Sequence, residues 1–306
     1  MTVPVTLTGP AELAALRTAS PVTWFALAKT RPMAATVSQD QKLRILSLPD
    51  GAEHRVIDVA GRNIDVFAFS PDGQSVAIGD HKGRVSVWAT ETGQVRFELQ
   101  LARYPGIAVF SRNGALLAIT SQGDAVQLID VGTGKPSAVL GTPIGGTSTL
   151  AFSRDGRIVA TGDGDAVVRV YDVRTGKRLA ENRELLMIPL AIDVSADGAT
   201  AIVGGGDKTL LFIDTATGKT LRRLDRTMQP PAILEVAPDG KSFTIAYMNA
   251  ANMTVPDHVV IAETSSGQPQ LDWLPPAFPV GGGWTSDGRM LVAIASKDAL
   301  HLWQLR

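Results

Sequence analysis

FSRDGRIVATGDGDAVVRVYDVRTGK, residues 152–177, contains two segments that resemble ligand-binding loops. GDGDA (162–166) has the Asp-x-Asp pattern of a calcium loop, and RTGK (174–177) resembles part of a phosphate loop. The same stretch also consists of short apolar runs separated by turn residues, which is the form of a structural repeat. Recurrence along the chain distinguishes a repeat from a single site.

The stretch recurs with a period of about 42 residues. A turn signature, Ser-x-Asp/Asn-Gly, appears as SPDG, SRNG, SRDG and SADG and continues as APDG and TSDG. Its glycines are Gly73, Gly114, Gly156, Gly198, Gly240 and Gly288, spaced by 41, 42, 42, 42 and 48 residues. A second series is Gly51, Gly93, Gly134, Gly176, Gly218 and Gly267, spaced by 42, 41, 42, 42 and 49 residues. Two interleaved series with one period indicate a repeated unit.

Each unit predicts four short β-strands. Runs such as VAIG, VSVWAT, VRVYDV and LLFIDT are rich in branched apolar residues, too short for buried helices, and bounded by turn residues. We name the strands a (before the Asp-Gly turn), b (after it), c (ending at the Thr-Gly turn) and d. Several c strands are apolar at nearly every position, which is expected where a sheet is covered on both faces, as in stacked propeller blades.

The pattern FSPDGQSVAIGDHKGRVSVWATETG, residues 69–93, resembles a repeat of the WD-repeat (WD40-like) β-propeller family, and the resemblance extends over essentially the whole chain. The Gly-His pair of that family is missing from every repeat, and Trp-Asp never ends a strand c. Trp88 and Trp303 keep the tryptophan, Tyr171 replaces one, and Asp130, Asp172 and Asp214 keep the aspartate. The resemblance implies an all-β seven-bladed propeller with four-stranded antiparallel blades, in which the family's stabilising His–Asp–Ser–Trp network is incomplete.

The residue spacing within the repeats locates one insertion and the strand that closes the ring. The Asp-Gly glycine precedes the tryptophan-equivalent residue by 15 positions in every regular blade, but Gly240 precedes Ala262 by 22. Blade 6 therefore carries seven extra residues between strands b and c, within 247–258, on the face that family similarity makes the top. AELAALR (11–17) has helical propensity, but we expect it to form the strand d that closes the last blade, because an open blade leaves an unpaired edge.

The expected organisation is a single propeller over residues 1–306. The predicted blades are blade 1 at about 19–60, blade 2 at 61–102, blade 3 at 103–143, blade 4 at 144–185, blade 5 at 186–227, blade 6 at 228–274, and blade 7 at 275–306 with about 10–18.

Composition excludes several classes of function. The net charge of −1 gives no general attraction to nucleic acid or to an anionic membrane, and no apolar run reaches the roughly 18 residues needed to cross a bilayer. The absence of cysteine excludes disulfides and thiolate chemistry. The first twenty residues lack the features of a signal peptide, so we expect a cytoplasmic protein.

Ligand-binding interpretations of individual motifs are weak. Asp165 occupies the same place before strand c as Asp40 and Asp207, which favours a turn-capping role over calcium binding. GGGDKT (204–209) has Asp207 where a phosphate loop needs the glycine before its lysine, and ATGKT (216–220) has Ile213 in place of the leading glycine. A strand d, not a helix, is expected to follow ATGKT, so no helix N-terminus would hold a phosphate. The four histidines, His54, His81, His258 and His301, do not have metal-ligand spacing. We therefore expect no catalytic residues, no bound metal and no cofactor.

The expected function is a non-catalytic scaffold that binds another protein or peptide on its top face. Large apolar residues and prolines occur in the d–a connections RYPG, LLMIPL, TMQPP and WLPPAFPV, beside the blade 6 insertion, although buried loop packing would also explain them. The candidate partner-binding residues are Met248, Asn249, Asn252, Met253, His258, Tyr104, Met187, Ile188, Met228, Trp273 and Phe278.

Two alternatives remain open. A basic strip on the d strands of blades 4 and 5 is a candidate contact for an acidic partner. The other is a propeller enzyme of lactonase or hydrolase type, which would require carboxylates or histidines with perturbed pKa at one end of the channel. A smooth, uncharged channel mouth would favour the scaffold.

Overall fold

The structure is a computed structural model of the chain. It describes residues 10–121, 123, 125–141, 144–225, 227, 229–248, 256–277, 279–296 and 299–305. The side chains of residues 248, 256, 257 and 280 also lie outside the description, although their backbones belong to strands.

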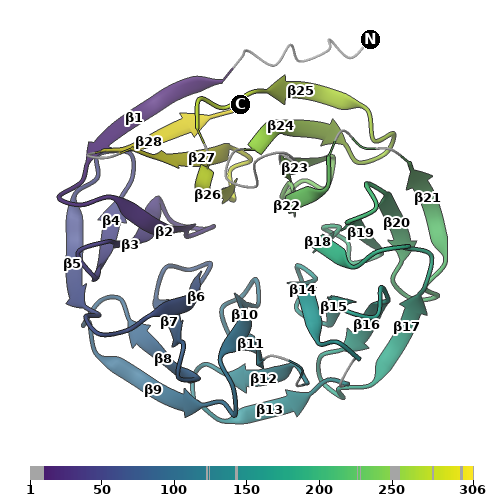
Figure 1. Cartoon of the computed structure of the whole chain (residues 1–306), viewed down its shortest axis with the longest axis horizontal. Helices are drawn as coiled ribbons and strands as arrows, with labels where there is room; N and C mark the ends of the chain where they lie inside the picture. Colours follow the sequence, from purple (N-terminus) through teal and green to yellow (C-terminus); the bar gives the residue numbers. More distant parts are fainter. Residues whose placement is uncertain are drawn as a thin grey trace.

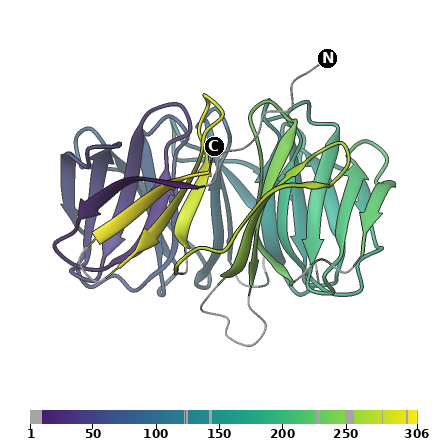
Figure 2. The same cartoon turned by 90° about the horizontal axis from the view of Figure 1, so that it is seen from above.

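Seven four-stranded antiparallel sheets stand around a central channel, which confirms the predicted seven-bladed propeller (Figure 1). In each sheet strand a lies at the channel and strand d at the rim. Because successive strands alternate in direction, the b–c turns and d–a connections share one face of the ring, the top face. The a–b and c–d turns share the opposite bottom face, and the strands run between the two faces (Figure 2).

From the channel to the rim, each blade contains strands a, b, c and d in that order. Blade 1 has β2 (Val22–Leu27), β3 (Met33–Ser38), β4 (Lys42–Ser47) and β5 (Glu53–Asp58), and blade 2 has β6 (Ile64–Phe69), β7 (Ser75–Asp80), β8 (Arg84–Ala89) and β9 (Val95–Gln100). Blade 3 has β10 (Pro105–Phe110), β11 (Leu116–Ser121), β12 (Gln127–Asp130) and β13 (Pro136–Val139), and blade 4 has β14 (Thr147–Phe152), β15 (Ile158–Asp163), β16 (Val168–Asp172) and β17 (Arg178–Asn182). Blade 5 has β18 (Pro189–Val194), β19 (Thr200–Gly205), β20 (Leu210–Asp214) and β21 (Thr220–Leu224), and blade 6 has β22 (Pro231–Val236), β23 (Ser242–Met248), β24 (Pro256–Glu263) and β25 (Pro269–Trp273). Blade 7 has β26 (Pro279–Trp284), β27 (Met290–Ala295), β28 (Ala299–Gln304) and β1 (Ala11–Arg17).

The core lies between the blades. All six residues of β7 are buried, as expected for a strand with neighbours on both faces of its sheet. One cluster joins Ala160 and Val170 of blade 4 to Val203 and Leu211 of blade 5, and similar clusters join the other blades. A blade therefore completes its core only when both neighbours are present.

The a–b turns share one hydrogen-bonding arrangement. In blade 2, Ser70 Oγ donates to Asp72 Oδ1 at 2.6 Å and accepts the N–H of Ser75 at 2.8 Å. Gly73 supplies the positive φ of 71° that the turn requires. The same side-chain contact recurs in Ser111–Asn113, Ser153–Asp155, Ser195–Asp197 and Thr285–Asp287. The recurring Asp-Gly signature is thus explained by the turn and needs no ligand.

Residues 11–17 form a strand, as predicted against their helical propensity. β1 pairs antiparallel with β28 from Ala11↔Gln304 to Arg17↔Ala299, and Leu16 is buried between blades 1 and 7. Propensity is overridden here because the pairing covers the edge of β28.

The blade 6 insertion lies between the two longest strands of its sheet. β23 and β24 extend their pairing to Met248↔Pro256. The seven residues between them, 249–255, lie outside the described residues. In the part of the chain that the structure describes, no helix is long and apolar enough to cross a membrane.

Removing residues 1–18 is expected to lower the melting temperature by at least about 10 °C, because blade 7 loses a strand and its core is exposed. Leu16→Ala is expected to cost about 2–4 kcal/mol through the cavity it leaves. Leu13→Ala in the same strand is the matched control, because that side chain is exposed. Thermal and urea unfolding measure both effects. An unchanged melting temperature after truncation would contradict closure by β1.

Candidate functional site

The Asp-x-Asp loop of blade 4 is held by an arginine. Arg169 Nη1 lies 2.7 Å from Asp163 Oδ2, and Arg169 Nη2 lies 2.6 Å from Asp165 Oδ2. Burial raises the pKa of Asp163, whereas the hydrogen bond from Arg169 lowers that of Asp165. Among the described residues, no three Asp, Glu or His side chains are grouped as a metal site requires. The loop is a b–c turn stabilised by an internal ion pair.

RTGK and ATGKT, the segments that resemble phosphate loops, are also turns. Asp172 Oδ1 accepts the N–H of Thr175 at 2.7 Å and its hydroxyl at 2.6 Å, which lowers the pKa of Asp172. Asp214 and Thr217 make the same contacts within ATGKT. In each motif the glycine adopts positive φ and a strand d follows, so the backbone N–H groups are used within the sheet and its turns.

The exposed apolar residues are distributed unequally between the two faces. Six large apolar side chains are exposed on the top-face connections: Tyr104, Ile144, Leu186, Met187, Ile188 and Leu274. Six others lie on the outer strands, and Ile233 lines the channel. Of the residues that the structure describes, none of the exposed large apolar ones lies in an a–b or c–d turn. When the two faces are compared, the exposed large apolar side chains of the described residues therefore lie on the top face and not on the bottom face.

The top-face connections are anchored to the b–c turns. Asp207 Oδ2 accepts the N–H of Leu186 at 2.9 Å, and Ile188 O accepts the N–H of Gly206 at 3.0 Å. Leu186 is 80 % exposed and Met187 53 % exposed on this anchored backbone. The backbone is thus held in place while its apolar side chains face solvent.

The predicted partner-binding residues divide into three groups. Met187 and Ile188 are exposed, and Tyr104 is exposed with one face stacked on His81 at 5.5 Å between ring centroids. Trp273 is half-buried against Trp303 of blade 7, and His258 pairs with Asp272 at 2.5 Å. The others lie outside the described residues, apart from the backbone of Met248: Asn249, Asn252, Met253, Met228 and Phe278.

The basic strip on blades 4 and 5 is partly paired. Its cations are Lys177, Arg178, Arg183, Lys219, Arg222, Arg223 and Arg226, the last of which lies outside the described residues. Arg178 and Arg183 both contact Glu181, and Arg223 contacts Asp225. Arg222 lies 4.0 Å from the ring centroid of Phe212. These contacts balance only part of the positive charge, because Arg178 and Arg183 share one carboxylate and no ion pair joins Lys177 or Lys219 to an acid among the described residues.

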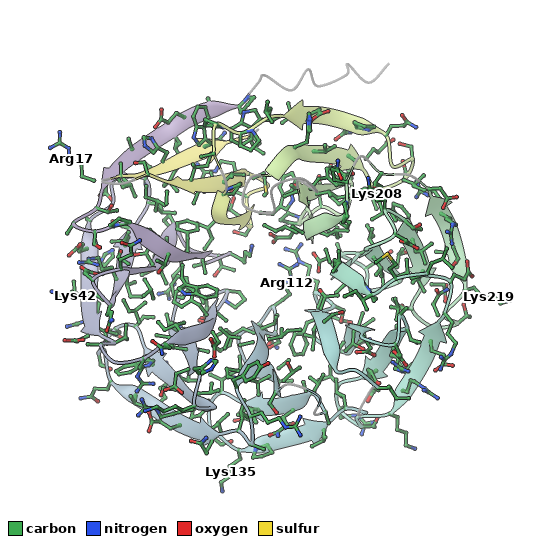
Figure 3. The ribbon with its side chains drawn as sticks, viewed as in Figure 1. Arg17, Lys42, Arg112, Lys135, Lys208 and Lys219 are labelled. Atoms are coloured by element: carbon green, nitrogen blue, oxygen red, sulfur yellow. The ribbon has the colours of Figure 1, made fainter. Side chains whose placement is uncertain are left out.

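The bottom mouth of the channel holds a charged cluster that spans the ring. Arg112 of blade 3 points into the central opening (Figure 3). Its Nη2 lies 3.0 Å from Asp193 Oδ2 of blade 5, and its Nη1 lies 3.4 Å from Glu235 Oε1 of blade 6. Lys29 of blade 1 reaches the same Glu235 oxygen at 2.7 Å. A Cβ at Gly283 would collide with the Lys29 ammonium, so the glycine leaves room for this pair.

Both carboxylates also join neighbouring blades through the backbone. Asp193 Oδ2 accepts the N–H of Val236 at 2.8 Å, and Glu235 Oε2 accepts the N–H of Trp284 at 3.3 Å. These N–H groups belong to innermost strands, whose channel-side edges have no further strand to pair with. Burial raises the pKa of Asp193, and the nearby Asp193 charge raises the pKa of Arg112.

Comparison with known families agrees with this geometry. The family model described as WD domain, G-beta repeat matches residues 134–172, which run from the c–d turn of blade 3 to the end of strand c in blade 4. The match covers one repeat, and the other blades share its four-stranded form. The chain is a seven-bladed β-propeller that resembles the WD-repeat family.

The propeller lacks the complete tryptophan network that the resemblance to the WD-repeat family would imply, as its sequence predicts. The indole Nε1 atoms of Trp88 and Trp303 are buried and have no hydrogen-bond partner among the described residues. Trp88 instead packs under the guanidinium of Arg62, 5.5 Å from the ring centroid.

Sequence reasoning missed the charged mouth of the propeller, although the repeat register contains it. The second residue of the a–b turn is an equivalent position in all seven blades. From blade 1 to blade 7 it is Lys29, Pro71, Arg112, Arg154, Ala196, Pro238 and Ser286. The residue two before each turn is, in order, Ala26, Ala68, Val109, Ala151, Asp193, Glu235 and Gly283. Charged residues in an otherwise small or apolar series are the signal that could have identified the cluster.

Arg112→Ala is expected to lower the free energy of unfolding at pH 7 by about 3 kcal/mol, because it leaves Asp193 buried without its cation. Since the pKa of Asp193 is raised in the folded state, protonation favours folding, and the deficit should shrink as the pH falls toward about 4. Urea unfolding of wild type and variant at several pH values measures this.

Arg157→Ala is the control, because this exposed arginine lies on the a–b turn of blade 4 and its pair with Asp155 contributes less than about 1 kcal/mol. Adding Asp193→Asn to Arg112→Ala should restore part of the lost stability. A deficit that is equal in both arginine variants, or independent of pH, would contradict the role given to the pair.

Proposed function

We propose that this propeller is a non-catalytic interaction scaffold that binds another protein or peptide on its top face. The observation that carries the proposal is the difference between the two faces: among the described residues, the d–a connections of the top face expose large apolar side chains and the turns of the bottom face expose none. Exposed apolar groups on an anchored backbone bury their surface on binding with little ordering cost.

The proposed surface is an arc over blades 3 to 7. It includes Ile144, the segment 186–188 and Leu274, with Tyr104 at its beginning. Polar residues of the b–c turns adjoin it, such as the exposed His81, which stacks on Tyr104. An apolar centre with a polar border is the usual composition of a protein-binding surface, so we expect a partner segment that presents apolar side chains. The blade 6 insertion, 249–255, belongs to the same proposed surface by its place between β23 and β24.

Affinity capture tests the proposal. The intact protein is compared with the triple variant Leu186→Ser, Met187→Ser and Ile188→Ser, and with a form lacking residues 249–255. We expect partners of the intact protein to bind the top-face variants at least about tenfold more weakly, which corresponds to about 1.4 kcal/mol. The matched control is Leu179→Ser with Leu221→Ser, because both leucines are exposed on outer strands.

The melting temperatures of the serine variants should stay close to that of the intact protein, since the substituted side chains are exposed. Partners that are recovered equally by the intact protein and by both top-face variants would refute the proposed surface.

The charged channel mouth favours a second candidate, a propeller enzyme of lactonase or hydrolase type. Asp193 and Glu235 converge there, and the raised pKa of Asp193 is a property of many catalytic carboxylates. Both carboxylates, however, accept hydrogen bonds from cations and backbone N–H groups, so neither presents an unused oxygen as a general base.

An esterase and lactonase substrate screen distinguishes the two candidates. We expect no turnover above background from the intact protein. Turnover that is lost in Glu235→Gln, while the variant remains folded, would favour the enzyme over the scaffold.

A further inference from the structure

The bottom mouth of the channel also contains a small cavity, on the opposite face from the proposed docking surface. Its volume is about 170 Å3, below the roughly 300–1,000 Å3 of pockets for drug-sized ligands. Lys29, Arg112 and Arg154 line it, together with Asn113 and Ser286. We propose that this cavity binds a small anion carrying a carboxylate or phosphate group.

Three of the seven a–b turns contribute a cation to this cavity. Lys29, Arg112 and Arg154 occupy the same position of the repeat, and the ring brings this position of every blade to the channel mouth. Two carboxylates, Asp193 and Glu235, lie within reach of these cations. The local charge of these five residues is therefore positive by one unit, and the excess favours an anion.

The carboxylate oxygens are already occupied. Asp193 Oδ1 accepts from Arg112 and the N–H of Val194, and Oδ2 accepts from Arg112 and the N–H of Val236. Glu235 Oε1 accepts from Lys29 and Arg112, and its Oε2 accepts the N–H of Trp284. The acceptors at the mouth are thus committed to the fold.

The donors at the mouth are not fully used. Arg154 Nη1 donates to the carbonyl of Pro238, and no ion pair joins Arg154 to a carboxylate among the described residues. The Lys29 ammonium has three N–H groups and makes one ion pair, with Glu235. Asn113 uses its side-chain oxygen within its own turn, which leaves its amide nitrogen as a donor. A donor-rich cavity with positive charge matches a carboxylate or phosphate, which supplies only acceptors when ionised.

Isothermal titration with inorganic phosphate and with succinate, each against sodium chloride at matched ionic strength, tests the proposal. We expect saturable binding of at least one of the two anions. Arg154→Gln should raise its Kd about tenfold or more, because it removes the cation without a carboxylate partner and leaves the Arg112 network intact. Arg157→Gln removes the same charge from the same turn outside the cavity, and its Kd should stay within about twofold of wild type.

The outcomes are distinct. Binding of phosphate alone identifies a phosphate group as the ligand chemistry, binding of succinate alone identifies a carboxylate, and binding of both identifies a general oxyanion site. No saturable binding of either probe up to about 20 mM, well above a weak Kd of about 1 mM, overturns the proposal. Equal weakening by Arg154→Gln and Arg157→Gln also overturns it, because this would show diffuse surface attraction. Neither result bears on the top-face scaffold, whose test uses other residues.

Discussion

The burial of each blade by its two neighbours is the constraint on which the rest of the structure depends. A sheet such as that of blade 2, whose strand β7 is buried along its whole length, cannot be stable in water with either face uncovered. Seven such sheets satisfy one another only in a closed ring. Closure in turn requires that β1, from the beginning of the chain, pair with β28 from its end. The strong helical propensity of AELAALR is overridden because the ring offers this segment a strand partner and a core position for Leu16.

Closure also divides the molecule into two chemically different faces. The bottom face is built of short turns whose Ser, Asp and Gly residues satisfy their own backbone groups, and it has ionic contacts at its centre. The top face is built of connections that vary in sequence from blade to blade and carry Ile144 and the segment 186–188 outward. Variation is tolerated there because the anchoring contacts, such as that between Asp207 and Leu186, involve the backbone and leave the side chains free to differ.

The charged mouth also follows from closure. The innermost strands have an edge that no further strand covers, and Asp193 and Glu235 satisfy two of its N–H groups. A carboxylate buried at such a place needs a cation, and Arg112 supplies it from across the channel. The cluster thus supplies hydrogen-bond acceptors to backbone N–H groups at an uncovered sheet edge. Some of its donors remain unused because it has three cations and two carboxylates.

The sequence by itself determined the number of blades, the order of their strands, the closing strand and the place of the insertion in blade 6. These follow from local chemistry, since an Asp-Gly or Thr-Gly turn demands its residues at a fixed spacing. It also indicated that Asp165 of GDGDA and the RTGK segment belong to turns, because both positions recur in register. Only the tertiary structure decided that Arg112 meets Asp193 and Glu235, and that Leu186 and Met187 face solvent while Trp273 packs on Trp303. Contacts across the channel and the exposure of a loop depend on the distances between blades, which spacing along the chain does not encode.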